Sequence, residues 1–268
     1  MHLMGIINVT PDSFSDGGKW ANAQQAIAHG IDLMDQGATI LDIGGESTRP
    51  GAQALTWDEE WARIENVVSE LARQGESRGV VISIDTYHSQ TARRAVASGA
   101  GIINDVTGGA DPDMFATVSE LGCDYILQHS RGNSQTMNAL ATYHNIVDDV
   151  CAELRERRDL AVAAGISPER IIIDPGLGFA KMGDNDWDIL AGIDQFNALG
   201  HRVLVGASRK RFIGRLVGDD SADRDVSTGV ISGYLAQHGV WAARVHNVRS
   251  SVAVLATLEK LHQHTNVR

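Results

Sequence analysis

The segment from Asp42 to Gly51 combines residue types that suit the binding of an anion. An apolar run over residues 39–43 ends abruptly at two glycines, and the loop Ser47-Thr48-Arg49-Pro50-Gly51 follows. Glycine allows close approach of the backbone to a ligand, and hydroxyl and guanidinium groups donate hydrogen bonds to anionic oxygens. The pattern predicts a buried strand that ends in an anion-binding loop.

Similar polar groups follow the other short apolar runs of the chain. Along the sequence they are Asn8 with the loop over residues 10–18, Asp85-Thr86, Asn104-Asp105, Gln128-His129 with Arg131, residues 174–179 with Lys181, residues 206–211, and Arg244-Val245-His246. If these runs are parallel strands of one sheet, their carboxyl ends lie on one side of it, where α/β proteins bind their ligands.

These groups fall into three chemical sets. Asp85, Asn104, Asp174 and Lys210 offer the acceptors and donors that a flat heteroaromatic ring with an aminopyrimidinone edge requires. Arg49, Arg244 and His246 instead suit phosphate oxygens. Asn8 offers a hard oxygen ligand to magnesium, which usually keeps water and phosphate as its other ligands.

Taken singly, each of these residues also has a purely structural interpretation. Asp85 or Asp105 alone suits a helix N-cap, and His129 or His246 alone suits a hydrogen-bonded barrel residue. The run Arg209-Lys210-Arg211 is typical of a solvated helix start. The paired glycines at 44–45 and 108–109 suit simple turns. The functional interpretation depends on convergence of all these groups on one face.

The elements that must position these groups alternate regularly. Strands are predicted at 4–9, 39–43, 80–84, 101–104, 124–127, 170–173, 203–205 and 242–245. Helices of period about 3.6 are predicted at 21–36, 57–74, 89–98, 112–121, 143–164, 186–199, 226–238 and 249–262. Most are followed by a glycine suited to a left-handed helix end, at 37, 75, 99, 122, 165, 200 and 239. Eight strand–helix units predict a single-domain (β/α)8 barrel over residues 1–268, with a doubly wound sheet as the alternative.

Composition narrows the class of protein further. The chain has 268 residues, is 43% hydrophobic and carries a formal charge of −11, which argues against a nucleic-acid or anionic-membrane surface. Cys123 and Cys151 have no metal-binding spacing, so we expect reduced structural thiols. The first residues lack the features of a signal peptide, and no run is long enough to span a bilayer. We expect a cytoplasmic protein.

In combination, these motifs resemble the dihydropteroate synthase family. The residues that carry the resemblance are the segments 8–18, 42–51, 83–86, 104–106, 174–179, 208–210 and 244–246, which follow one another in the family's order over nearly the whole chain. The resemblance implies an enzyme of folate biosynthesis that joins 4-aminobenzoate to (7,8-dihydropterin-6-yl)methyl diphosphate and releases diphosphate. It also implies magnesium, a homodimer and sensitivity to sulfonamides.

The resemblance also implies a role for each matching residue. Asp85, Asn104, Asp174 and Lys210 would hold the pterin, with Arg244, His246 and magnesium on Asn8 holding the diphosphate. Two loops, with Asp12, Phe14 and Asp16 in the first and Thr48 and Arg49 in the second, would close over the diphosphate and complete the aminobenzoate pocket. Phe179, Lys210 and the start of the helix after Lys210 would line the rest of that pocket, and Ser208 would also bind substrate. An SN1-like loss of diphosphate suits this site, because the pterin ring can delocalise the cation.

Four positions depart from the family's pattern. Gln128 and Ser130 flank His129 where some members have methionines, Arg211 stands where some have serine, and Asn247 replaces a frequent aspartate. Two alternatives to this interpretation stay open. A methyltetrahydrofolate:corrinoid methyltransferase would share the pterin contacts but has no use for a diphosphate site. A non-catalytic relative would bind pterin or a protein partner without turnover.

Overall fold

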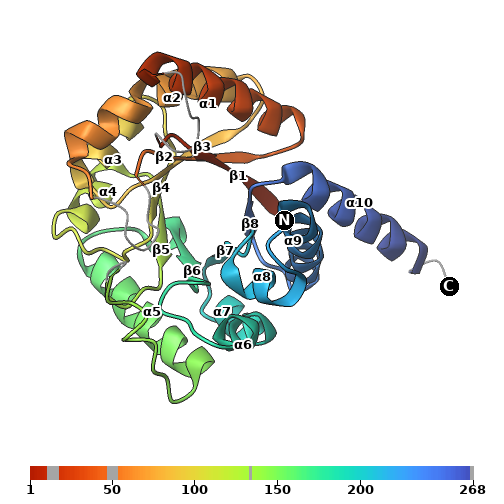
Figure 1. The fold of residues 1–268 in the computed structure, drawn as a ribbon. Helices are drawn as coiled ribbons and strands as arrows, with labels where there is room; N and C mark the ends of the chain where they lie inside the picture. Colours follow the sequence, from red (N-terminus) through yellow and green to blue (C-terminus); the bar gives the residue numbers. More distant parts are fainter. Residues whose placement is uncertain (11–17, 47–53, 133–134, 266–268) are drawn as a thin grey trace.

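Eight parallel strands close into a barrel in chain order, with helices around the outside (Figure 1). The computed structural model describes residues 1–10, 18–46, 54–132 and 135–265. The strands are β1 (His2–Asn8), β2 (Ile40–Gly44), β3 (Val81–Asp85), β4 (Ile102–Asp105), β5 (Asp124–Gln128), β6 (Ile171–Asp174), β7 (Arg202–Val205) and β8 (Ala242–Val245). Pairing of β1 with β8 closes the sheet, so the (β/α)8 prediction is confirmed and the doubly wound alternative is wrong.

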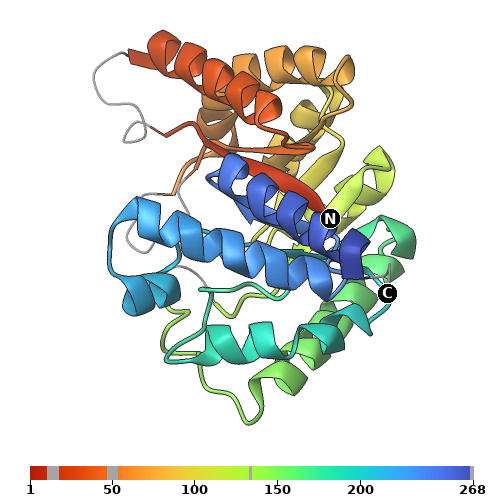
Figure 2. The same cartoon turned by 90° about the vertical axis from the view of Figure 1, so that its right-hand side faces the viewer.

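The helices alternate with the strands as the sequence predicts, with differences at their ends. They are α1 (Gly18–Asp35), α2 (Trp57–Glu76), α3 (Ser89–Ala97), α4 (Met114–Leu121), α5 (Ile146–Ala163), α6 (Asn185–Ala191), α7 (Ile193–Asn197), α8 (Arg211–Val217), α9 (Ser221–Gln237) and α10 (Val248–Thr265), with a 3-10 turn, η2, at Pro168–Arg170. In the side view of Figure 2, α10 runs back toward the end of the barrel at which β1 begins.

Side-chain caps explain two of the shifted helix starts. Asn145 accepts hydrogen bonds from the backbone N–H groups of Val147 and Asp148, so α5 begins later than predicted. Asp220 accepts from Ala222 and Asp223, so α9 begins earlier than predicted.

Three details of the helix prediction are wrong. Helix α8 lies outside the eight predicted ranges. The helix predicted at 186–199 is two helices that meet at Gly192, where an added Cβ would lie 2.8 Å from Val147 Cγ2 on α5. Close packing against α5 therefore coincides with the break. Gly75 lies inside α2 instead of ending it, and the left-handed residue of that turn is Gly79, with φ +67°. The glycines predicted to follow the other helices have positive φ.

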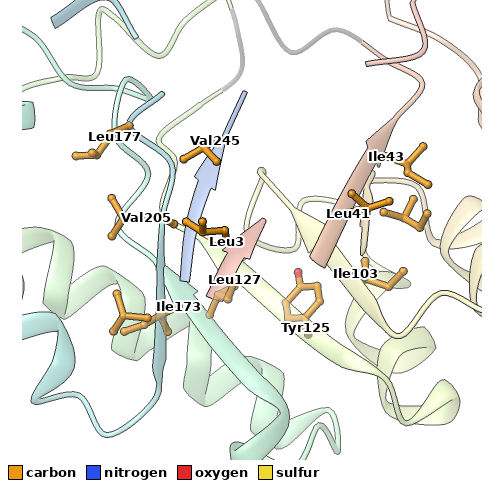
Figure 3. Close-up of a cluster of buried hydrophobic side chains, with 14 of the residues drawn as sticks. Leu3, Leu41, Ile43, Ile103, Tyr125, Leu127, Ile173, Leu177, Val205 and Val245 are labelled. Carbon is orange, nitrogen blue, oxygen red and sulfur yellow. The ribbon is translucent and has the colours of Figure 1, made fainter. Parts of the chain in front are cut away.

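The hydrophobic core has two layers. The larger one fills the space between the strands and the helices and includes Leu41, Ile103 and Val205 (Figure 3). The smaller one fills the barrel interior near the start of the strands, and its members are Met4, Ile40, Ile102, Ile126, Ile172, Leu204 and Ala242. This inner layer closes one end of the barrel, so an interior ligand site has to lie at the carboxyl ends of the strands.

The two thiols agree with the prediction, because Cys123 and Cys151 are both buried and unpaired. Within the described ranges, the helices are all too short or too polar to cross a membrane.

Candidate active site

A polar layer lies directly beyond the apolar interior of the barrel. Side chains alternate between the two faces of a strand, so residues two apart point the same way. The pairs that follow this rule are Ile40 and Asp42, Ile102 and Asn104, Ile126 and Gln128, Ile172 and Asp174, and Ala242 and Arg244. The carboxyl-terminal half of the barrel interior is therefore lined with carboxylates, amides and a guanidinium, as the convergence argument predicts.

Asp42 is the centre of this layer. Its carboxylate is fully buried and accepts hydrogen bonds from Ser83 Oγ at 2.6 Å and Asn104 Nδ2 at 3.0 Å. Arg244 Nε donates to the same carboxylate at 2.6 Å, and its Nη2 donates to Asp85 Oδ2 at 2.7 Å. One arginine thus joins strands β2, β3 and β8, and its guanidinium is held in a fixed orientation at the barrel mouth.

Sequence reasoning did not place Asp42 among the site residues. The available signal was its position, since a carboxylate inside the apolar run 39–43 has to face either the packed helices or the barrel interior. Burial of an unpaired charge is costly, so an acid at this position requires a cation or several donors. The distant Arg244 supplies the cation.

Three acceptors predicted to hold a pterin meet at this mouth. Asn104 Oδ1 is buried and lacks a hydrogen-bond partner among the described residues, so a ligand N–H would satisfy it. Burial raises the pKa of Asp85 to about 7. The positive charge of Arg244 opposes this shift, and the neighbouring carboxylate of Asp42 adds to it. Burial also raises the pKa of Asp174, although Lys210 opposes the shift. Bonds from ligand N–H groups would stabilise both carboxylates.

Lys210 and Phe179 lie together on the side of β6 and β7. Lys210 Nζ donates to the carbonyl oxygen of Leu177 and lies 5.0 Å from the centre of the Phe179 ring. Burial lowers the pKa of Lys210 to about 8, while Asp174 pulls it upward. The structure therefore brings Lys210, Phe179 and Asp174 together, as the resemblance implies.

The segments that follow β7 and β8 are joined by two sets of hydrogen bonds. Ser208 Oγ lies 3.0 Å from His246 Nδ1 and accepts from the His246 backbone N–H at 3.1 Å. Arg209, which has φ +57°, donates two hydrogen bonds of 2.7 Å to Asp225 on α9. Asn247 Nδ2 donates to the same carboxylate at 3.1 Å.

These contacts explain one departure from the family pattern and the behaviour of the basic run. An amide at position 247 can donate to Asp225, whereas an ionised aspartate would repel it. The three basic residues of the run differ in environment: Arg209 is paired with Asp225, Lys210 enters the site, and Arg211 is exposed at the start of α8. The solvated interpretation therefore applies to Arg211 alone.

Asp105 is structural. Its carboxylate accepts from the backbone N–H groups of Thr107 and Gly109 and from Tyr125 Oη at 2.7 Å. These bonds fix the turn after β4, much as a helix cap would. Asp85 instead accepts a hydrogen bond from Arg244, so the two acids have different roles.

His129 lies in a buried chain of polar groups next to the site. Its Nε2 lies 3.0 Å from Glu153 Oε2 and its Nδ1 lies 2.9 Å from Lys181 Nζ. The predicted hydrogen-bonded role of His129 is thereby confirmed. Gln128, the first residue in place of a methionine, is buried and donates to the carbonyl oxygen of Val106 at 3.2 Å. Ser130 is partly exposed.

Asn8 stands at the carboxyl end of β1, opposite Gly44 of β2, and is partly exposed. Over residues 1–10, 18–46, 54–132 and 135–265, groups of three or more His, Cys, Asp or Glu residues suited to a metal are absent. The donor set therefore fits magnesium only when water and substrate phosphate supply most of the ligands. The predicted site residues Asp12, Phe14, Asp16, Thr48 and Arg49 lie outside the described residues.

Comparison with known proteins shows the family. The model of the family described as "Pterin binding enzyme" matches residues 4–246. Dihydropteroate synthase of Mycobacterium leprae is 45% identical over 263 residues, which cover 95% of this chain and 91% of the relative. The chain belongs to the dihydropteroate synthase family.

Solved structures of dihydropteroate synthases superpose closely on this barrel. The enzyme of Xanthomonas albilineans with 4-aminobenzoic acid has a TM-score of 0.90 at 39% identity, over 97% of this chain and 93% of the other. The enzyme of Anaplasma phagocytophilum with bound 6-hydroxymethylpterin-monophosphate has a TM-score of 0.89 at 37% identity, over 97% and 98%. Membership of this family makes the chain a transferase and does not favour the corrinoid methyltransferase alternative.

Proposed function

We propose that the polar mouth of this barrel condenses (7,8-dihydropterin-6-yl)methyl diphosphate with 4-aminobenzoate to give 7,8-dihydropteroate and diphosphate. The observation that carries this proposal is the convergence of Asp85, Asn104 and Asp174 with two cations, Arg244 and Lys210, above a closed apolar layer. Two relatives of the same fold hold a pterin monophosphate and 4-aminobenzoic acid, which are ligands of the two kinds that this reaction joins.

Pterin recognition would use the acceptors of the inner layer. The unsatisfied Asn104 Oδ1 and the carboxylate of Asp174 suit the N–H groups of an aminopyrimidinone. Lys210 would donate to a ring oxygen or nitrogen. Since burial keeps the carboxylates poorly solvated, a ligand that supplies well-aligned donors replaces water at little cost.

Diphosphate recognition would use Arg244, His246 and Ser208. A guanidinium carries five N–H donors, so Arg244 can donate to phosphate oxygens while Asp42 and Asp85 hold it in place. Its contacts fix the orientation before the substrate arrives, so little reorganisation is needed when negative charge develops on the leaving group.

Asn8 would contribute its amide oxygen to magnesium at the same end of the barrel. Bound there, the ion would neutralise charge on the departing diphosphate.

The chemistry requires no nucleophilic side chain. In an SN1-like step, the bond between the methylene carbon and the diphosphate oxygen breaks, and the electron pair leaves with the diphosphate. The pterin ring delocalises the cation, which Asp85 and Asp174 stabilise electrostatically. The neutral arylamine then attacks the same carbon and loses a proton, so its close placement supplies much of the remaining acceleration.

A homodimer in the cytoplasm completes the proposal. Large apolar side chains are exposed on neighbouring helices, namely Leu216 on α8 and Val226 and Val230 on α9, each more than 60% exposed. A patch of this kind suits burial against a second copy. Sedimentation at several concentrations tests the dimer, and Val230→Glu should shift the protein to a monomer if this patch forms the interface.

Sulfonamide competition tests the proposed function. With release of dihydropteroate as the assay, a sulfonamide should raise the KM for 4-aminobenzoate and leave kcat unchanged, because both would occupy one pocket. Pterin binding without any dihydropteroate would contradict the proposal and favour the non-catalytic alternative.

A further inference from the structure

We propose that Lys181 is a positioning residue for the aminobenzoate side of the site and that it acts by fixing Phe179. This inference rests on the proposed function, since it assigns a role within that reaction. Lys181 lies only 4% exposed at the end of the segment after β6, and its Nζ donates to the carbonyl oxygen of Phe179 at 2.9 Å.

Every residue from Gly176 to Ala180 has a defined contact. Gly176 N–H donates to Asp174 Oδ1 at 2.7 Å, and Gly178 N–H donates to Asp186 Oδ1 at 2.6 Å. The carbonyl oxygens of the segment accept from Lys210, Lys181 and Tyr143, at residues Leu177, Phe179 and Ala180 respectively. The Leu177 side chain is fully buried in the outer core, where Figure 3 shows it in the same cluster as Val245.

Lys181 is itself held by a chain of polar groups that leads away from the site. An ammonium group can donate hydrogen bonds but cannot accept them. His129 Nδ1 therefore accepts from Lys181, and His129 Nε2 donates to Glu153. Arg131 Nε closes the chain with two contacts of 3.1 Å to the Glu153 carboxylate. Burial and the neighbouring Lys181 lower the pKa of His129 to about 4, so the ring is neutral near pH 7 and can accept at Nδ1.

Lys181 connects Phe179 to β5 and α5, and this location indicates a positioning role. On one side, the chain through His129 and Glu153 connects it to β5 and α5. On the other, its bond to the Phe179 carbonyl fixes the residue whose ring faces Lys210 at 5.0 Å. Burial lowers the pKa of Lys181 to about 7, although Asp186 and Asp174 oppose the shift. Burying an amine of this kind costs more free energy than one hydrogen bond to a carbonyl group returns. A requirement for an accurately placed Phe179 explains why a buried amine donor is used there.

The test is a double-mutant cycle on Lys181 and Phe179. Lys181→Met keeps an unbranched side chain that is one atom shorter and removes the donor. Phe179→Ala removes the ring that Lys181 is proposed to place. Tyr143→Phe is the matched control, because it removes a hydrogen bond to the next carbonyl group of the same segment. Wild-type formation of dihydropteroate is measured first, so that a failure of the proposed function is recognised separately.

We expect Lys181→Met to raise the KM for 4-aminobenzoate by about tenfold, the effect of one lost hydrogen bond. Affinity for the pterin substrate should change by less than about twofold in the same variant. In the Phe179→Ala background, Lys181→Met should cause little further rise, whereas Tyr143→Phe should leave the KM close to that of wild type. An unchanged KM in Lys181→Met, or effects of Lys181→Met and Phe179→Ala that multiply, would overturn the proposal.

Glu153→Gln provides a second variant if Lys181→Met fails to fold. Glu153 has a side chain that is 36% exposed, so its substitution is better tolerated than a change at Lys181. Loss of its charge loosens His129 and should raise the same KM by about two- to fourfold, with the pterin affinity unchanged. An equal loss of affinity for both substrates, or no effect on either, would contradict the positioning role.

Discussion

Arg244 Nε lies 2.6 Å from Asp42 Oδ2, although 202 residues separate them in the sequence. The contact joins β8 to β2 across the interior of the barrel, past β1, which lies between them in the sheet. It gives the buried carboxylate its cation and gives the guanidinium a fixed direction. A ligand that arrives at this mouth therefore meets a cation that is already oriented.

Asp42→Asn should lower kcat/KM by about a hundredfold, because Arg244 loses its strongest partner and its orientation. The measurement is steady-state kinetics with both substrates varied. Ser83→Ala, which removes only the 2.6 Å hydrogen bond to Asp42, is the matched control and should have a much smaller effect. Equal activity of Asp42→Asn and wild type would show that the contact has no role in turnover.

Arg244→Ala should reduce kcat/KM by about a hundred- to a thousandfold, since a charge-assisted contact near the leaving group is lost. It also leaves two carboxylates, Asp42 and Asp85, without their shared cation. Arg244→Lys separates these effects, because it restores charge without the two-pronged geometry. Unaltered catalytic efficiency in Arg244→Ala would remove this residue from the site.

Asp174→Asn should weaken pterin binding by about ten- to a hundredfold, because an acceptor-only carboxylate becomes a group that is partly a donor. Isothermal titration calorimetry with the dihydropterin substrate measures this directly. Asp105→Asn is the control, because its carboxylate binds the turn after β4 and should alter stability instead of pterin affinity. Wild-type affinity in Asp174→Asn would refute the assignment.

Stability should fall on acidification between pH 6.5 and about 4, with His129 as one cause. Burial and Lys181 lower the pKa of His129 from 6.5 to about 4 in the folded protein. Between these values the unfolded chain binds more protons, so the free energy of unfolding decreases as the pH falls. Melting temperatures across this range should fall less steeply for His129→Asn than for wild type. Parallel curves would show that His129 is not the titrating group.

Removal of magnesium by a chelator should abolish turnover, and addition of the ion should restore it, if Asn8 and the substrate diphosphate hold the metal together. Asn8→Ala should raise the magnesium concentration needed for half-maximal activity. Full activity in the presence of excess chelator would contradict the proposed metal requirement.

The fold was largely predictable because strand and helix periods are local properties of the sequence. All eight strands lie within two residues of their predicted bounds. The break at Gly192 coincides with close packing against Val147 of α5, a contact remote in the sequence that no local pattern contains. The error at Gly75 is local: α2 continues to Glu76 and the chain turns at Gly79, so close that an added Cβ at Gly75 would lie 2.7 Å from the carbonyl oxygen of Val80.

The site was predictable in part. Polar residues at strand ends were recognisable from their position, and the motif order identified Asp85, Asn104, Asp174 and Lys210. Asp42 was missed because it lies within an apolar run, and its role follows only from a partner on β8. The link between Lys181 and His129 likewise depends on contacts across 52 positions, which no local pattern contains.

Formation of product by the purified protein is the decisive measurement of the proposed synthase activity. The protein would be incubated with magnesium, (7,8-dihydropterin-6-yl)methyl diphosphate and 4-aminobenzoate, and both dihydropteroate and diphosphate would be quantified over time. We expect equal amounts of the two products, each dependent on both substrates. Binding of the pterin substrate with neither product formed, under conditions in which a known dihydropteroate synthase turns over, would contradict it.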